Sequence, residues 1–239
     1  MKILYVSNGC KKNVSVKNMK NKSILFILLL LIFAQSASSQ AIKGLGLKTG
    51  ISYANHKWNY TDSYLSKLYK NEPNGVIFFN IGVFGEFLSS DFASTVLDIW
   101  YTSKGANFEY NTKDKFGNIT GTEEVENRLR YFSVSLTEKI RAESRRQGFG
   151  VYLSAGPRLD MLLSRNTDLD YSVTYEQSNV TVFGLALAGG CSFLFTNARL
   201  LLEFFYNPDF GKTIDNQNGT VKSYDYGFRV GIEGIFKKR

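Results

Sequence analysis

Apolar side chains recur at every second position along most of the chain after residue 44. From Tyr224 to Phe236 the even-numbered positions are aromatic or aliphatic except for Gly234, and the odd-numbered positions are mainly glycine or charged. Such a period of two is typical of β-strands with one apolar and one polar face. The pattern predicts eight strands, at residues 44–54, 76–88, 92–104, 129–140, 149–163, 181–194, 199–206 and 223–236.

The connections between these segments alternate in length. Those at residues 89–91, 141–148 and 195–198 are short, whereas those at 55–75, 105–128, 164–180 and 207–222 are long and polar. Single-chain outer-membrane barrels have short periplasmic turns and long outer loops, and an even number of strands. The sequence therefore predicts an all-β fold, an eight-stranded antiparallel up-and-down transmembrane β-barrel.

The apolar faces of these strands carry aromatic residues near both ends, as expected of the girdles that mark the two membrane interfaces. The outer girdle is predicted at Phe79, Tyr101, Phe183, Tyr224 and Tyr226, and the periplasmic girdle at Phe87, Phe149, Phe193 and Phe236. Aliphatic residues such as Leu47, Ile81, Leu97, Leu153, Leu187 and Val230 lie between them. Strand 129–140 fits this scheme only if Glu138 lies at the membrane rim.

The first 39 residues have the composition of a secretory leader. Lys20 and Lys22 precede the apolar run 24–34, and small residues follow at 36–39. A charged, apolar and then small-residue order is that of a signal peptide, and the run is too short for a membrane-spanning helix. We expect residues 1–39 to be an N-terminal extension and cleavable signal peptide, with Met19 as an alternative start and Ala41 as an alternative cleavage site. Residues 40–239 form the barrel domain.

The net charge of +8 is concentrated in the leader. Residues 1–39 hold six lysines and no acidic residue, so the remaining chain carries 23 basic and 21 acidic side chains. A balance this close to neutral argues against a nucleic-acid partner. The mature chain keeps one cysteine, Cys191, which excludes an internal disulfide.

Charged residues on the polar faces are expected to point into the lumen. They are Lys48, Glu86, Asp98, Lys104, Lys139, Arg158, Asp160, Glu203, Asp225, Arg229 and Glu233, interleaved with glycines. An eight-stranded barrel is only wide enough inside for side chains to fill it, so we expect these charges to pair and close the lumen. The alternative is a narrow polar pathway or a ligand pocket.

Catalytic chemistry finds little support in the sequence. The single histidine, His56, begins the first long loop, where Asp62, Ser63 and Glu72 follow without a catalytic spacing, and it is expected to be a solvated side chain. Glu123, Glu124 and Glu126 lack the spacing of a Ca²⁺ site. We expect neither an enzyme nor a bound cofactor or metal.

Four short stretches resemble the PorT-like family of outer-membrane β-barrel proteins. They are residues 99–106 (IWYTSKGA), 131–139 (YFSVSLTEK), 152–157 (YLSAGP) and 202–207 (LEFFYN). Two positions depart from the family pattern, since Ser135 replaces a usual proline and Phe205 a frequent arginine. The resemblance spans most of the mature chain and implies an outer-membrane barrel, without implying the namesake's role in protein secretion.

These observations favour a non-enzymatic barrel of the bacterial outer membrane with a structural, adhesion or accessory role. Its expected partners are outer-membrane lipid and a protein bound through the extracellular loops. One rival is a narrow pore, or a barrel that transports or binds a small hydrophobic ligand. Another is a secreted soluble barrel of lipocalin type, in which the apolar faces would point inward and the charges outward.

Overall fold

The computed structural model describes residues 40–60, 74–90, 92–114, 116, 118–144, 148–166, 178–216 and 219–236, nearly all of them in β-strands. The strands are β1 (Gln40–Tyr60), β2 (Asn74–Ser89), β3 (Ala93–Lys113), β4 (Ile119–Ser144), β5 (Phe149–Asn166), β6 (Thr181–Leu194), β7 (Ala198–Pro208), β8 (Ile214–Asn216) and β9 (Gly219–Ile235). No helix in these ranges is long and apolar enough to span a membrane.

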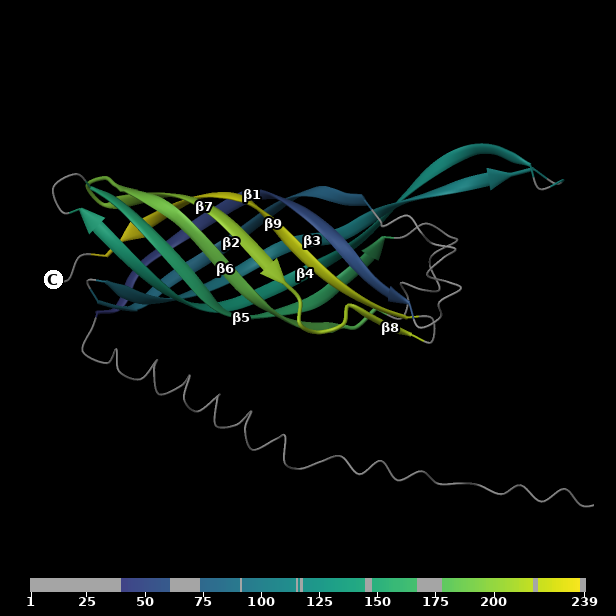
Figure 1. Ribbon diagram of the computed structural model, residues 1–239. Coiled ribbons are helices and arrows are strands. Elements are labelled where there is room, and N and C mark those ends of the chain that lie inside the picture. The colour runs from purple at the N-terminus through teal and green to yellow at the C-terminus, as the bar shows by residue number, and fades with distance from the viewer. Residues whose placement is uncertain are drawn as a thin grey trace, which may run out of the picture. The chain divides into compact units, whose positions relative to one another are not determined.

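Eight of these strands form a closed antiparallel ring (Figure 1). They follow one another in the order β1-β2-β3-β4-β5-β6-β7-β9, and β9 pairs back onto β1 from Gly44↔Ile235 to Tyr60↔Gly219. The three-residue β8 pairs with β9 beyond the end of β7. Closure removes the open sheet edges that would otherwise leave backbone groups unpaired. The predicted fold class is confirmed, and each predicted strand overlaps one strand of the ring.

The strands differ from the prediction mainly at the end of the barrel that carries the long connections, which we call the outer end. The expected loop 105–128 is wrong, because β3 and β4 remain paired as far as Lys113↔Ile119. Beyond Asn107 and Arg128 these two strands pair only with each other, so they form a ribbon that continues past the barrel (Figure 1). The short β8 was not predicted either.

The apolar faces of the strands point outward. Leu153 is 71% exposed and Ile77 is 68% exposed, whereas the charged side chains on the opposite faces are buried. This is the reverse of a soluble lipocalin-type barrel, in which apolar side chains line the interior. The alternative of a secreted soluble barrel is therefore wrong.

Aromatic side chains occupy both ends of the outward face. The Tyr53 and Tyr226 rings lie 5.4 Å apart toward the outer end, and the Phe149 and Phe193 rings lie 5.4 Å apart toward the opposite end, which carries the short turns. Aromatic side chains at two such levels mark the boundaries of an apolar band. We call this band, between the two levels of rings, the apolar belt.

Glu138 lies among apolar side chains on the outward face of the barrel. On the outward face of β4 it stands between Leu136 and Ile140, both exposed, and opposite Ala155 of β5. Ala155 is six residues from the girdle residue Phe149, about 20 Å along the strand. On its other side Glu138 pairs with Thr95 of β3, which in turn pairs with the girdle residue Phe87. Strand 129–140 itself forms, within β4.

Candidate functional site: the barrel lumen

The inward faces of the strands carry the charges that the alternation assigns to the lumen. The buried ones are Lys48, Glu86, Asp98, Lys104, Lys139, Arg158, Asp160, Glu203, Asp225 and Glu233, and Arg229 is half-buried. In the described ranges, lumen ion pairs join eight basic residues, Lys43, Lys48, Lys104, Lys139, Arg141, Arg158, Arg199 and Arg229, to eight acidic ones, Glu86, Asp98, Glu143, Asp160, Glu203, Asp209, Asp225 and Glu233. The positive and negative charges of these ion-paired side chains are therefore equal in number.

Glycines on the same faces leave room for these long side chains. A Cβ atom on Gly184 would lie 2.8 Å from Nη2 of Arg158, and one on Gly231 would lie 2.8 Å from Cγ of Lys48. Both distances are shorter than carbon atoms tolerate without rearrangement. The alternation of glycine with charge in the sequence is thus a packing requirement of a narrow lumen.

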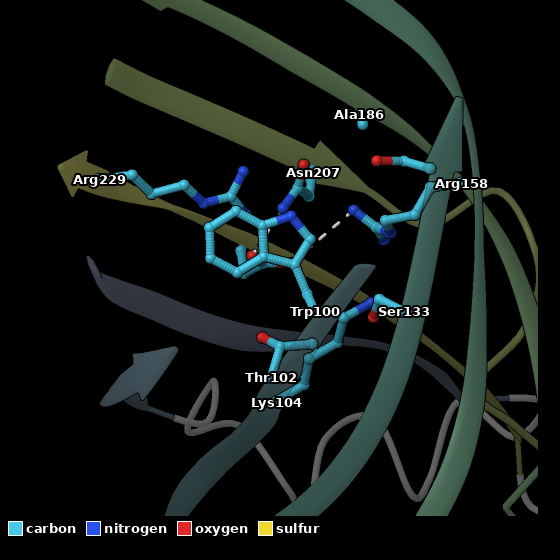
Figure 2. Close-up of a pocket in the computed structure, with 10 residues that line it drawn as sticks. Trp100, Thr102, Lys104, Ser133, Arg158, Ala186, Asn207 and Arg229 are labelled. Atoms are coloured by element: carbon cyan, nitrogen blue, oxygen red, sulfur yellow. Dashed lines mark hydrogen bonds and ion pairs between the residues drawn. The ribbon is translucent and has the colours of Figure 1, made fainter. Parts of the chain in front are cut away.

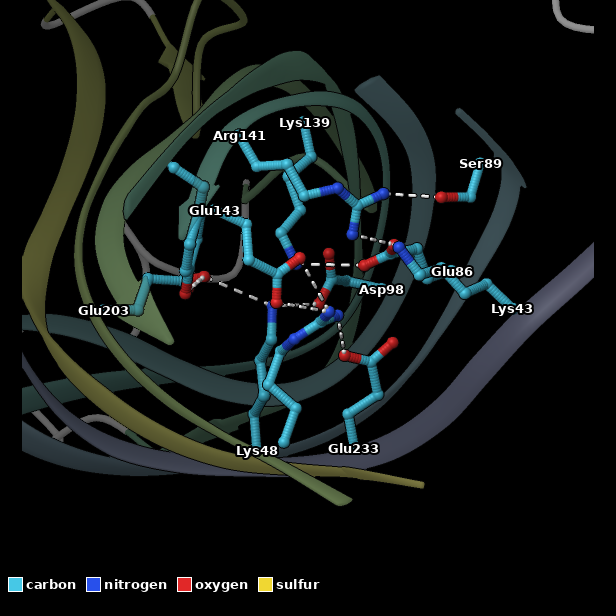
Figure 3. A network of polar contacts seen from close by, with 12 residues as sticks. Lys43, Lys48, Glu86, Ser89, Asp98, Lys139, Arg141, Glu143, Glu203 and Glu233 are labelled. Carbon is cyan, nitrogen blue, oxygen red and sulfur yellow. Dashed lines mark hydrogen bonds and ion pairs between the residues drawn. The ribbon is translucent and has the colours of Figure 1, made fainter. Parts of the chain in front are cut away.

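Glu86 is the centre of the ion pairs nearest the short turns (Figure 3). Its Oε2 atom lies 3.0 Å from Nζ of Lys139, and its Oε1 atom lies 2.6 Å from Nη1 of Arg141. Lys43 approaches the same carboxylate at 3.5 Å. Close by, Arg199 contacts Glu233 at 3.0 Å. Arg199 also contacts Glu143 of β4 at 3.1 Å, so this group connects strands that are not neighbours in the ring.

A second group lies further along the lumen and is shared by four strands. Lys48 Nζ donates to Asp98 at 3.0 Å and to Glu203 at 3.3 Å. Arg229 approaches Glu203 at 3.5 Å while its guanidinium lies over the Phe205 ring, 3.5 Å from the centroid. Phe205, the departure from the family pattern, therefore supports a cation from β9, and Glu203 keeps two cationic partners.

The outer group is built around Lys104 and Arg158. Lys104 Nζ lies 2.6 Å from Asp160 and 2.6 Å from Asp209. Arg158 also contacts both carboxylates, through Nε at 3.0 Å from Asp160 and through Nη2 to Asp209. Asp225 lies 3.9 Å from Nη1 of Arg158. Two cations thus face three carboxylates across the lumen.

Between these groups lies a cavity with a volume of about 10 Å³ (Figure 2). Its walls are Trp100, Thr102, Lys104, Ser133, Ser135, Arg158, Ala186, Asn207, Asp225 and Arg229. A cavity needs about 10–15 Å³ of this kind of space to hold one water molecule. The lumen therefore has room for about one water at this level, and none for a hydrated ion.

The segment after β7 folds inward over the outer mouth. The backbone N–H groups of Phe210 and Gly211 both donate to the carbonyl of Phe183, each at 2.9 Å. The backbone N–H of Thr213 donates to the carbonyl of Val221 at 2.7 Å. These bonds position Asp209 against the outer ion group. They also bring Ile214 into a buried apolar cluster with Leu129, Tyr131, Val182 and Val221.

His56 belongs to this closed mouth and not to a solvated loop, so that expectation was wrong. It lies on β1, is 2% exposed, and its Nδ1 atom is 2.7 Å from Oγ of Ser223. Ser223 Oγ in turn lies 2.8 Å from Oγ1 of Thr213. Burial, and secondly the nearby charge of Lys104, lower the pKa of His56 to about 3, so its ring is neutral at pH 7.

Several lumen residues were missed from the sequence. Arg141 and Glu143 fell in the expected turn 141–148, and Asp209 fell in the expected loop 207–222. None of these three residues was therefore considered inward-facing. Arg199 shares its parity with Glu203 on β7, and alternation alone could have identified it. Strand ends are where a sequence pattern is weakest, because the turn and loop geometry decides where pairing stops.

The remaining candidates for catalysis or metal binding lie partly outside the described residues, as Asp62, Ser63 and Glu72 do. The side chains of Glu123 and Glu124 are also outside them, and Glu126 is exposed beside Arg128 at 2.7 Å. No group of three His, Cys, Asp or Glu in the described part of the chain is arranged to hold a metal ion.

Comparison with known proteins gives a family match and structural neighbours. The family model described as outer membrane protein beta-barrel domain matches residues 33–215. OprG from Pseudomonas aeruginosa is 10% identical with a TM-score of 0.50, over 84% of this chain and 99% of OprG. Neisserial surface protein A is 13% identical with a TM-score of 0.47, over 82% of this chain and 100% of its own. At such identity the likeness to OprG shows a common fold alone. No curated protein sequence matches the chain.

Proposed function

Because the chain belongs to the family of outer membrane protein beta-barrel domains, we propose that it is a closed, non-enzymatic barrel that holds its outer ribbon and loops for contact with partners outside the cell. The barrel itself is the membrane anchor. Its role is structural, adhesive or accessory, and its lumen conducts neither ions nor small solutes.

The filled lumen is the observation that carries this proposal. Charged side chains from parts of the chain that are not neighbours in the ring meet inside it, as in the contact of Lys104 with Asp209 at 2.6 Å and that of Lys48 with Glu203 at 3.3 Å. A path for ions would require breaking these pairs, because the cavity between them measures about 10 Å³. Uncoupling a buried ion pair costs about 3–5 kcal/mol. A barrel whose lumen is filled by such ion pairs is rigid and offers no open path for transport.

The ribbon formed by β3 and β4 supports a role in contact with partners. It continues past the ring and pairs to Lys113↔Ile119, so it presents two strand edges away from the membrane. Exposed strand edges are ready templates for another chain.

The non-enzymatic part of the proposal is supported by the closed outer mouth. The nearest approach to a base and nucleophile in the described residues is the pair of His56 and Ser223, and each is 2% exposed. A substrate would have to displace the segment around Thr213 to reach Ser223. Such burial is typical of a structural hydrogen bond.

Two finer assignments belong to the same proposal. The four sequence stretches described above support membership of the PorT-like barrels, and the leader composition supports a cleavable signal peptide at residues 1–39. Amino-terminal sequencing of the protein purified from the outer-membrane fraction tests the second assignment, because a mature chain beginning at Gln40 or Ile42 is expected. An amino terminus that retains the apolar run would contradict it.

Planar-bilayer recording tests the closed barrel directly. The purified protein, shown to be folded by its heat-modifiable migration on gels, is added to a bilayer at increasing voltage. We expect no steady single-channel steps. Reproducible steps of one size would refute the closed lumen and favour the narrow-pore alternative. A second variant replaces residues 109–123, the outer part of the β3–β4 ribbon, by a short turn. This variant should keep the heat-modifiable gel migration of the wild type and should also show no conductance.

A further inference from the structure

Two lysines stand directly opposite each other on the outward face near the outer end. Lys57 of β1 pairs in register with Lys222 of β9, and both side chains are exposed. No acidic residue forms an ion pair with either of them in the described part of the chain. Lys212, by contrast, is exposed near the same end and pairs with Asp215 at 3.0 Å.

This arrangement is unfavourable for the protein by itself. Side chains directly opposite in an antiparallel pair have Cβ atoms about 5 Å apart, and like charges at that distance destabilise the pair. An anion between the two ammonium groups would turn the repulsion into two attractive contacts. The compact ammonium of lysine suits a phosphate group, which it binds as a point charge.

The height of the lysine pair indicates which anion it meets. Lys57 is four residues beyond Tyr53, whose ring packs against Tyr226 at the outer edge of the apolar belt. Four residues cover about 13 Å along a strand, or about 10 Å of height at the tilt of a membrane barrel. The headgroups of a bilayer lie just outside its hydrocarbon core. The ammonium groups therefore stand level with the headgroups of the outer leaflet.

We propose that Lys57 and Lys222 form a binding site for the phosphate of a glycolipid of the outer leaflet. The inference rests on the outer-membrane orientation of the proposed function. A membrane-anchored phosphate is favoured over free phosphate because the acyl chains of the lipid pack on the adjacent apolar belt and hold its headgroup at this height. The half-buried Tyr224, next but one to Lys222 on the same face, borders the site on the membrane side.

Binding of lipid A to the full-length protein in detergent micelles, measured by native mass spectrometry at low salt, tests the site. Each lysine near an anionic lipid surface contributes about 1 kcal/mol, so the Lys57→Gln/Lys222→Gln variant should bind about thirtyfold more weakly. Lys212→Gln is the matched control, because it removes one positive charge from a lysine that already has a carboxylate partner. The Lys212→Gln variant should bind lipid A as tightly as the wild type does.

Lys57→Glu separates binding from stability. It places a carboxylate opposite Lys222, which should stabilise the strand pair while weakening lipid A binding at least as much as the double variant does. Equal lipid A binding by wild type and the double variant would overturn the proposal. The proposal would also fail if wild type still bound lipid A without its phosphates more tightly than the double variant does. It would fail as well if inorganic phosphate at the concentration of the lipid displaced lipid A from the protein. None of these results alters conductance, so failure of this site is distinct from failure of the closed barrel.

Discussion

Asp209, in the segment after β7, lies 2.6 Å from the Nζ atom of Lys104 on β3, across the mouth of the barrel. The same carboxylate contacts Arg158 on β5. One side chain from a connecting segment thus links two strands that are not its neighbours in the ring. The contact makes the outer segment part of the barrel interior.

Asp209→Ala should lower the free energy of unfolding by about 3 kcal/mol, because it leaves Lys104 and Arg158 buried with one carboxylate fewer. Guanidinium unfolding in lipid vesicles, followed by tryptophan fluorescence, measures this change. Asp215→Ala is the matched control, since Asp215 belongs to the same segment but pairs with Lys212 in solvent. It should change stability by less than about 1 kcal/mol. Equal effects of the two substitutions would show that the inward contact contributes nothing.

Glu86→Gln should destabilise the barrel by about 3–5 kcal/mol, because Lys139, Arg141 and Lys43 would then surround a neutral amide. The loss appears as a lower temperature at which the folded form converts to the unfolded form on gels. Glu126→Gln removes the same charge from an exposed pair with Arg128 and should leave that temperature nearly unchanged. A Glu86→Gln variant as stable as wild type would mean that the surrounding cations are solvated.

Glu138→Gln should stabilise the folded barrel in lipid by about 1–2 kcal/mol. A charged side chain on the lipid-facing surface is unfavourable, less so for carboxylates than for arginine or lysine. The substitution keeps an oxygen that can accept the hydrogen bond from Thr95 Oγ1, now 2.7 Å from the carboxylate. Vesicle unfolding midpoints provide the comparison, with Leu136→Glu as the opposite change. A destabilised Gln variant would indicate that the carboxylate itself is needed on this face.

His56 should make the barrel less stable in acid. It lies beyond the aromatic boundary of the apolar belt, and its pKa is lowered to about 3 by burial and then by Lys104. Unfolded histidine binds a proton below about pH 6.5, whereas the folded form stays neutral. The stability contributed by the neutral ring is thus fully present above pH 6.5 and is lost toward pH 3, by about 1.4 kcal/mol per pH unit.

The comparison of wild type with His56→Gln isolates this effect from the carboxylates that titrate in the same range. The Gln variant should show a shallower fall of the unfolding midpoint between pH 6.5 and pH 4. Identical pH profiles would mean that the folded protein protonates His56 as readily as the unfolded chain does.

The lumen was predictable as a set of inward-facing charges but not as a set of partners. Glu203 and Arg229 were assigned to the lumen from strand parity, yet their 3.5 Å contact depends on the register of β7 against β9. Asp209 could not be assigned at all, because a segment without alternation gives no direction to its side chains. The burial of His56 has the same origin, since β1 continues past the expected strand end at residue 54.

The sequence by itself determined the number of strands in the ring, their order and the face that each presents to the membrane. These properties follow from local periodicity, because successive side chains on a strand point to opposite sides. Only the tertiary structure decided that Lys57 faces Lys222, that Glu138 lies opposite Thr95 and that Asp209 closes the mouth. Each of these depends on register between strands or on the path of a connecting segment. Register is set by all the pairings of the closed ring together, which no single segment records.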